Sequence, residues 1–185
     1  MSLETGILGY LKMRSMSGYD LKKIFNYSAN FFWPADQAQI YKALAKLVKE
    51  GLVELPKQAQ GKTVDRKVYT ITEKGGKALH DWIANPNESD FISRLPFIMQ
   101  LFYSGSLSKE EQLAFLDEQL RINNEFVQRI KENYSENGDV FAEIAGLPEG
   151  DRRLESATYA CRWGILRGET YAKLLEEIKE DILSK

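Results

Sequence analysis

The chain has 185 residues, of which 43% are hydrophobic and 28% are charged, and its formal net charge is −2 at pH 7. A chain of this length forms one large domain or two small ones, and it contains no apolar run of the roughly 18 residues that cross a membrane. Cys161 is the single cysteine and His80 the single histidine, so the composition excludes an internal disulfide and a zinc site built from several thiolates.

Two short helices are predicted at the start of the chain. The first spans Leu3–Met13 and the second spans residues 19–27, and each repeats apolar residues on one side. The polar residues 15–17 separate them. An aromatic segment at residues 31–34 precedes a third helix, and Pro34 suits the first turn of that helix because its ring fixes a helical φ.

The third helix carries the most informative pattern. Its apolar residues form one stripe, at Ile40, Leu44, Leu47 and Val48. The opposite side carries amide and ammonium groups at the same period, at Gln39, Lys42, Lys46 and Lys49. A helix that is buried on one side and offers hydrogen-bond donors on the other suits the major groove of DNA.

The two ends of this helix also carry signals. Gly51 falls just past the last turn, where a left-handed cap favours glycine. Asp36 lies near the start, where its carboxylate either caps the helix or accepts a hydrogen bond from a cytosine amino group. We favour the cap, because aspartate in a first turn is ordinary helix chemistry.

After this helix the pattern changes to two strands joined by a polar hairpin loop. The strands are predicted at residues 52–55 and 66–72, and Thr72 is a candidate N-cap for a fourth helix at residues 73–83. The loop and the start of the second strand carry four cations, at Lys57, Lys62, Arg66 and Lys67. A cationic hairpin beside a reading helix suits contact with phosphates or the minor groove, although lysines are also common in solvated loops.

Charge is divided unevenly along the chain. Residues 1–82 hold 13 lysines and arginines against 8 aspartates and glutamates, a balance of +5, whereas residues 83–185 hold 12 against 19, a balance of −7. This division indicates a polyanionic partner for the first part alone. The sign changes near residues 85–89, a polar segment that is typical of a linker.

The second part is predicted to be helical. A short apolar helix at residues 91–103 is interrupted near Pro96, and a capping box at residues 108–111 opens a long helix to about Tyr134. Glycines break the helical pattern at residues 135–150, and a last helix runs over Arg152–Leu183. The expected fold is therefore mainly α, with a winged helix-turn-helix domain at 1–84 and a helical dimerisation domain with two long helices at 89–185.

The expectation of dimerisation rests on a heptad-like seam in the last helix. The seam residues recur at alternating steps of three and four, at Leu154, Ala157, Cys161, Gly164, Gly168, Tyr171 and Leu175. A glycine within a helix costs about 1 kcal/mol against alanine, so Gly164 and Gly168 indicate close packing with another helix. That helix belongs either to a second chain or to the preceding long helix of the same chain, and the spacing is compatible with both.

Several segments together resemble the PadR family of bacterial transcriptional regulators. They are SGYDLKKIF, FFWPADQAQIYKALAKLVKEGLVE, KVYTITEKG and HDWI. The second half, in which SLSKEEQ opens a long helix, is similar to the virulence-activator-like C-terminal domain, and its two long helices resemble those of the phenolic-acid-responsive repressors. The resemblance implies a homodimer that binds pseudo-palindromic operators in double-stranded DNA and is often released by a small effector.

The resemblance also assigns expected DNA contacts. Tyr19 and Tyr41 fall where family members contact the DNA backbone. Gln39 and Lys42 fall on the reading face, and Lys62 falls at the tip of the wing. Together with the cations found from the helical and strand patterns, the expected contacts are Tyr19, Gln39, Tyr41, Lys42, Lys46, Lys62 and Arg66.

Aromatic residues are enriched near the junction of the two halves, and most of them are expected to form ordinary core. The candidates for contact with a small, flat aromatic effector are Trp33, Trp82, Phe91 and Phe97. No cofactor and no metal are expected. Two alternatives stay open: a winged-helix module that binds proteins without an operator, and a repressor that needs no ligand.

The sequence lacks the motifs of common enzyme classes. It contains no glycine-rich phosphate loop, no nucleophile elbow and no cluster of carboxylates with histidine. His80 is expected to be a packed or surface imidazole. The chain is therefore not expected to be an enzyme, and the cytoplasm is its expected location because no secretion signal opens the sequence.

Overall fold

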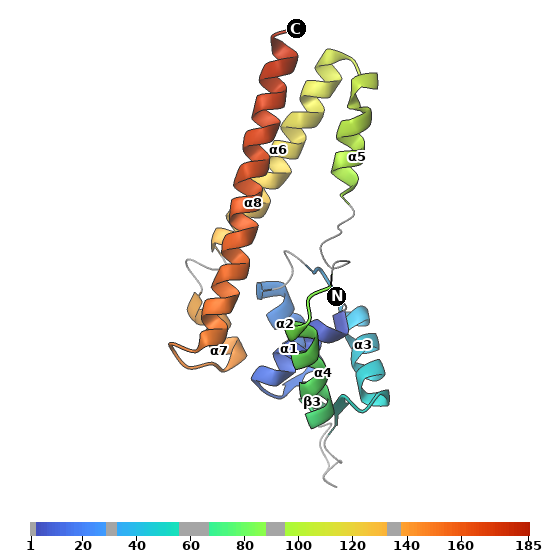
Figure 1. Ribbon diagram of the computed structural model, residues 1–185, viewed down its shortest axis with the longest axis vertical. Coiled ribbons are helices and arrows are strands. Elements are labelled where there is room, and N and C mark those ends of the chain that lie inside the picture. Colours follow the sequence, from blue (N-terminus) through green and yellow to red (C-terminus); the bar gives the residue numbers. More distant parts are fainter. Residues whose placement is uncertain (1–2, 29–32, 56–66, 88–94, 133–137) are drawn as a thin grey trace. The chain divides into compact units, whose positions relative to one another are not determined.

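The computed structural model describes residues 3–28, 33–55, 67–87, 95–132 and 138–185 (Figure 1). These residues are mostly helical, with a small antiparallel sheet. The elements are α1 (Leu3–Met13), β1 (Met16–Ser17), α2 (Gly18–Ser28), α3 (Gln37–Lys49), β2 (Val53–Glu54), β3 (Val68–Ile71), α4 (Glu73–Ala84), α5 (Pro96–Tyr103), η2 (Ser104–Ser106), α6 (Lys109–Lys131), α7 (Gly138–Ala145) and α8 (Arg152–Leu183). None of the helices in the described segments combines the length and hydropathy needed to span a membrane.

Contacts divide the chain into two compact units. The first contains Met1–Asp90 and Gly138–Leu154, and the second contains Phe91–Asn137 and Glu155–Lys185. The first unit is thus built from two separate stretches of the sequence. The limits expected from the sequence, 1–84 and 89–185, place residues 138–154 with the second domain, and those limits stay a prediction.

The core of the first unit lies where α1, α2 and α3 meet. Each helix contributes fully buried apolar side chains: Ile7 from α1, Leu21, Ile24 and Phe25 from α2, and Ile40, Leu44 and Leu47 from α3. Helix α1 also packs against α4 and β3. The apolar stripes seen in the sequence therefore face one shared core, as periodicity predicts.

The sheet has three strands in the order β1–β3–β2. Both outer strands pair antiparallel with β3, with Met16 opposite Tyr69 and Val53 opposite Ile71. The sequence predicts the two strands around the hairpin but only a polar break at residues 15–17, where β1 lies. A strand of two residues is too short to show an alternating pattern, so its pairing with β3 is visible only in the structure.

The ends of α3 and α4 are set by side-chain caps. The Asp36 side chain accepts a hydrogen bond from the backbone N–H of Gln39 at the start of α3, which confirms the predicted cap. The prediction that Pro34 lies in the first turn is wrong, because α3 begins only after Asp36. Gly51 follows α3 with φ of 68°, as a left-handed cap requires. The Thr72 side chain caps α4 as predicted.

Helix α7 lies in the segment for which the sequence predicts only a break. Phe141, Ile144 and Ala145 are buried, and α7 packs against α2 within the first unit. The guanidinium of Arg14 donates two hydrogen bonds to the carbonyl of Ile144, at 2.9 and 2.7 Å, and so satisfies a backbone acceptor at the end of α7. A helix of eight residues is marginal alone, so tertiary contacts stabilise it.

The second unit consists of α5, α6 and α8. Helices α6 and α8 lie side by side (Figure 1), and Lys131 of α6 forms an ion pair with Glu169 of α8 at 2.8 Å. Leu116 and Leu175 are fully buried. The capping box predicted at the start of α6 is present, with Ser108 as the N-cap.

Candidate nucleic-acid interface

Helix α3 has one buried and one exposed side, divided as its sequence predicts. Its buried residues are Ile40, Ala43, Leu44 and Leu47. Its exposed residues are Gln37, Ala38, Gln39, Tyr41, Lys42, Ala45, Lys46 and Lys49. The exposed side offers amide, ammonium and hydroxyl groups, together with two alanines that occupy little space. We call it the reading face.

Gln39 is engaged at the start of α3. Its Oε1 atom accepts a hydrogen bond from the backbone N–H of Asp36 at 2.9 Å, while Asp36 Oδ1 accepts from the backbone N–H of Gln39 at 2.7 Å. This reciprocal pair is a capping box, which satisfies backbone donors that the first helical turn leaves unpaired. The Gln39 side chain is thus folded back onto its own helix, and its contact with DNA stays a prediction.

Lys46 is also engaged within the protein. Its ammonium group donates a hydrogen bond to Glu4 Oε1 at 2.9 Å, which ties α3 to the start of α1. This hydrogen bond and the charge of the Glu4 carboxylate raise the pKa of Lys46. The carboxylate offsets the charge that Lys46 would offer to a phosphate, so the predicted DNA contact at Lys46 stays untested.

Tyr41 connects the reading face with the start of α2. A Cβ atom placed on Gly18 would lie 2.6 Å from Cε1 of Tyr41, so the Tyr41 ring lies directly over the first residue of α2. Tyr19 is the next residue of α2 and is 59% exposed, and Tyr41 is 43% exposed. Burial, and then the neighbouring Tyr41, raises the pKa of Tyr69. The structure thus brings Tyr19 and Tyr41 to the same edge of the first unit.

Three of the site residues predicted from the sequence lie outside the described residues. They are Lys62 and Arg66 of the wing and Phe91 of the effector set. Lys67, which follows the wing loop, is described and is exposed.

The other effector candidates are divided between the two units. Trp33 is half-buried and Trp82 is 37% exposed, and both belong to the first unit. Phe97 belongs to the second unit, where its ring stacks on Phe115 with centroids 5.8 Å apart and meets the edge of Tyr171 at 4.8 Å. Phe97 therefore serves the packing of α5 against α6 and α8, and the effector role of this set stays a prediction.

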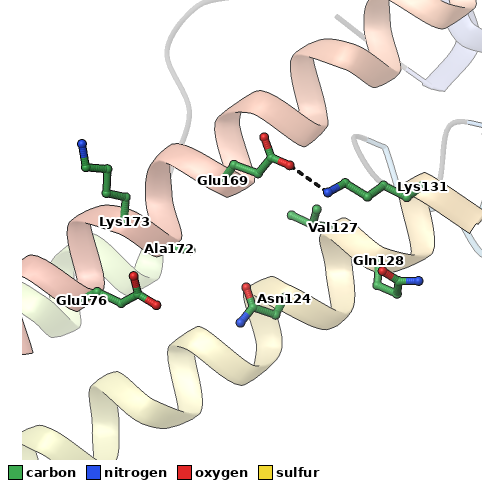
Figure 2. A pocket seen from close by; sticks show the side chains of 8 residues that line it. All are labelled: Asn124, Val127, Gln128, Lys131, Glu169, Ala172, Lys173 and Glu176. Atoms are coloured by element: carbon green, nitrogen blue, oxygen red, sulfur yellow. Dashed lines mark hydrogen bonds and ion pairs between the residues drawn. The ribbon is translucent and has the colours of Figure 1, made fainter.

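A groove of about 380 Å³ lies between α6 and α8 in the second unit (Figure 2). It is lined by Asn124, Val127, Gln128, Lys131, Glu169, Ala172, Lys173 and Glu176. The ion pair of Lys131 with Glu169 crosses it (Figure 2). The lining contains no aromatic side chain, so this groove offers no ring on which a flat aromatic molecule could stack.

The seam predicted on α8 meets α6 of the same chain at Gly168. A Cβ atom on Gly168 would lie 2.2 Å from Cγ2 of Val127, and Asn123 donates a buried hydrogen bond to the Gly168 carbonyl at 2.9 Å. Close packing inside one chain therefore explains the glycine at this position. Cys161, Gly164 and Leu175 are buried as well, and a role of the seam in dimerisation stays a prediction.

Large apolar side chains remain exposed on the other sides of the second unit. Helix α5 is apolar except for Gln100 but has no buried residue. Its exposed members, with those that flank it, are Leu95, Ile98, Met99, Phe102, Tyr103 and Leu107. Helix α8 exposes Tyr159, Trp163, Leu166 and Leu174 in the same way. We call these residues the apolar faces of α5 and α8. They lie outside the heptad seam, so the spacing of the seam residues does not reveal them.

Comparison with known proteins decides the family. Residues 7–81, which contain α2, α3 and the sheet, match the transcriptional regulator PadR-like family. The negative transcriptional regulator PadR of Bacillus subtilis is 32% identical over 119 residues, which cover 64% of this chain and 65% of that protein. Over residues 7–81 the chain belongs to the PadR-like family of transcriptional regulators. A probable transcriptional regulator of Mycobacterium tuberculosis is 36% identical over 86 residues, 46% of each chain.

The aligned sequences thus span less than two thirds of either relative's length, whereas the similarity in structure extends over whole chains. The crystal structure of Bacillus subtilis PadR in complex with operator DNA has a TM-score of 0.79 at 25% identity and covers 98% of this chain and 99% of that one. The Vibrio cholerae virulence activator AphA has a TM-score of 0.71 at 26% identity, over 99% of both chains. The chain shares with both proteins the winged helix fold with a helical C-terminal region, which confirms the fold class predicted from the sequence.

Proposed function

We propose that the chain is a homodimeric repressor that binds a pseudo-palindromic operator and is released by a small aromatic effector. The observation that carries the DNA-binding part is the reading face of α3. It presents Lys42 and Lys49 to solvent, next to Tyr19 and Tyr41. Ammonium and hydroxyl groups beside an exposed helix are the donors that proteins use for phosphates and base edges.

The similar proteins support DNA binding by the reading face. Bacillus subtilis PadR is described as a negative transcriptional regulator and has been crystallised with operator DNA. The structural likeness to that complex extends over 98% of this chain. We therefore propose that this chain also represses transcription. The positive charge balance of residues 1–82 agrees with a polyanionic partner.

The apolar faces of α5 and α8 support a homodimer. Large apolar side chains are normally buried, but Phe102 of α5 is 79% exposed and Trp163 of α8 is 57% exposed. An exposed apolar surface of this extent marks an interaction site. Because the seam at Gly168 already packs inside the chain, we propose that these apolar faces supply the additional contact with a second copy.

The effector candidates do not share one unit: Trp33 and Trp82 belong to the first unit and Phe97 to the second. Bacillus subtilis PadR has been crystallised with p-coumaric acid, which motivates the choice of probe. Hydroxycinnamates are therefore the compounds to titrate. A constitutive repressor is the alternative, and it predicts neither binding heat nor release of DNA with any of these compounds.

The proposal is tested on the DNA upstream of the chain's own gene. The dimer should protect two half-sites whose centres are about one helical turn, ~10 bp, or a multiple of it apart. Binding should weaken steeply with salt, because each phosphate contact releases counterions. Simultaneous replacement of Gln39, Lys42 and Lys62 by alanine should lower the affinity and the salt dependence. Unchanged affinity and salt dependence in this triple variant would overturn the assignment of the DNA contacts. A wild type that shows no salt-sensitive binding to this DNA would leave the protein-interaction module as the better account.

A further inference from the structure

The centre of the reading face is defined by helical spacing. With 3.6 residues per turn, Ala38, Lys42, Ala45 and Lys49 follow one another at steps of four, three and four and form a single line along α3. This line lies opposite the buried residues Ile40, Leu44 and Leu47. It is therefore the part of α3 that comes nearest to any groove into which the reading face docks.

The cations of α3 differ in what they can do. Lys46 is held by Glu4, as described above. Lys49 lies in the last turn, seven residues after Lys42 and hence about 10 Å further along the helix axis. Lys42 lies nearer the N-terminal end, which is the end of a reading helix that contacts base edges. It is exposed and forms no hydrogen bond or ion pair with the described residues.

The neighbours of Lys42 favour a base contact over a phosphate contact. Ala38 lies four residues before Lys42 and Ala45 lies three residues after it, each about one helical turn away. Both alanines are exposed and carry only a methyl group. Small side chains on both sides allow the helix backbone to approach the floor of the groove. A lysine stem between them then extends toward the base edges, where the O6 and N7 atoms of guanine are acceptors for an ammonium group.

We propose that Lys42 is the residue of α3 that determines base specificity, by donating to the major-groove edge of a guanine in each operator half-site. Gln39, the other candidate reader, stabilises the start of α3 through its capping box instead. Lys49 contacts phosphate without selecting a base. This inference rests on the proposed function, since it concerns how the same surface chooses among DNA sequences.

The experiment compares four full-length proteins in a selection from randomised double-stranded DNA. They are the wild type, Lys42→Ala, Lys49→Ala as the matched lysine control, and Gln39→Ala. The wild type should enrich a half-site with one strongly preferred guanine. Lys42→Ala should lose the preference at that position alone, by about ten-fold or more. Lys49→Ala and Gln39→Ala should retain the preference and bind more weakly.

A substitution in the DNA tests the contact between Lys42 and a single atom of the base, which a general loss of affinity would not reveal. Replacing the preferred guanine by 7-deazaguanine removes the N7 acceptor and should weaken binding by the wild type but leave binding by Lys42→Ala unchanged. Equal weakening in both proteins would overturn the proposal, as would a Lys42→Ala variant that keeps the base preference and only loses salt dependence. A wild type that enriches no sequence would instead reject operator binding itself, and the role of Lys42 with it.

Discussion

The ammonium group of Lys46 lies 2.9 Å from the Glu4 carboxylate, 42 residues away in the sequence, and joins the reading face of α3 to the first turn of α1. A lysine that already faces a carboxylate contributes less net charge to a DNA-binding surface than a lysine that faces solvent. Lys49 lies one turn further along α3 and is exposed.

We expect Lys46→Ala to reduce the salt dependence of operator binding by less than Lys49→Ala, which should remove about one unit of slope for one phosphate contact. Glu4→Gln should act in the opposite direction and steepen the slope, because it releases the ammonium group. Fluorescence anisotropy with labelled operator at several salt concentrations measures all three slopes. Equal losses for Lys46→Ala and Lys49→Ala would show that the ion pair opens when DNA binds.

Gly168 should not tolerate a methyl group. A Cβ atom there would lie 2.2 Å from Cγ2 of Val127, so Gly168→Ala should destabilise the protein by about 1–3 kcal/mol through overpacking, as measured by urea denaturation. Combining it with Val127→Ala should recover part of that loss. Gly9→Ala is the matched control, because nothing lies within 4 Å of its Cβ position, and it should stabilise α1 by up to about 1 kcal/mol. Additive effects of Gly168→Ala and Val127→Ala would contradict the contact.

Tyr171 should make the second unit sensitive to alkali. Burial raises the pKa of Tyr171 to about 12, above the usual value of about 10. Because the folded state holds the proton more tightly than the unfolded state, this stabilisation is present below pH 10 and is lost as the pH rises toward 12. Urea midpoints across this range should fall more steeply for the wild type than for Tyr171→Phe. Parallel curves for the two proteins would exclude Tyr171 as the cause.

Removal of α8 should abolish the dimer. A chain truncated after Gly150 retains α7 but lacks the apolar face of α8, so it should sediment as a monomer and bind the operator much more weakly. Trp163→Glu in the full chain tests the same face with little change to the packing of α8 against α6, because Trp163 is 57% exposed. A truncated chain that still sediments as a dimer would show that the apolar face of α8 is not the dimer interface.

Features that depend on a few neighbouring residues could be predicted from the sequence. Asp36 and Thr72 cap the helices that follow them, and Gly51 adopts the left-handed conformation after α3. Helix α8 spans Arg152–Leu183, the limits that the helical spacing of its apolar residues predicts. In each case the deciding interaction spans no more than one or two helical turns, so local spacing contains the information.

Features that depend on distant partners could not be predicted. The engagement of Lys46 requires knowing that Glu4 comes close to α3, and the closure of the seam requires knowing that Val127 meets Gly168. Helix α7 is short and glycine-bearing, so its pattern is weak, and burial against α2 decides its structure. On the reading face, periodicity selects the exposed side of α3 but does not distinguish an engaged side chain such as Gln39 from an open one such as Lys42.

The hydrogen bonds from Arg14 to the Ile144 carbonyl have a consequence for synthesis of the chain on the ribosome. The surface of α2 that α7 covers is made early, but α7 follows more than a hundred residues later. At a translation rate of about 5–20 residues per second, α7 is synthesised on the order of ten seconds after α2. The N-terminal unit therefore reaches its final packing only after α6 has been translated, and during that interval the uncovered apolar surface of α2 is available to chaperones.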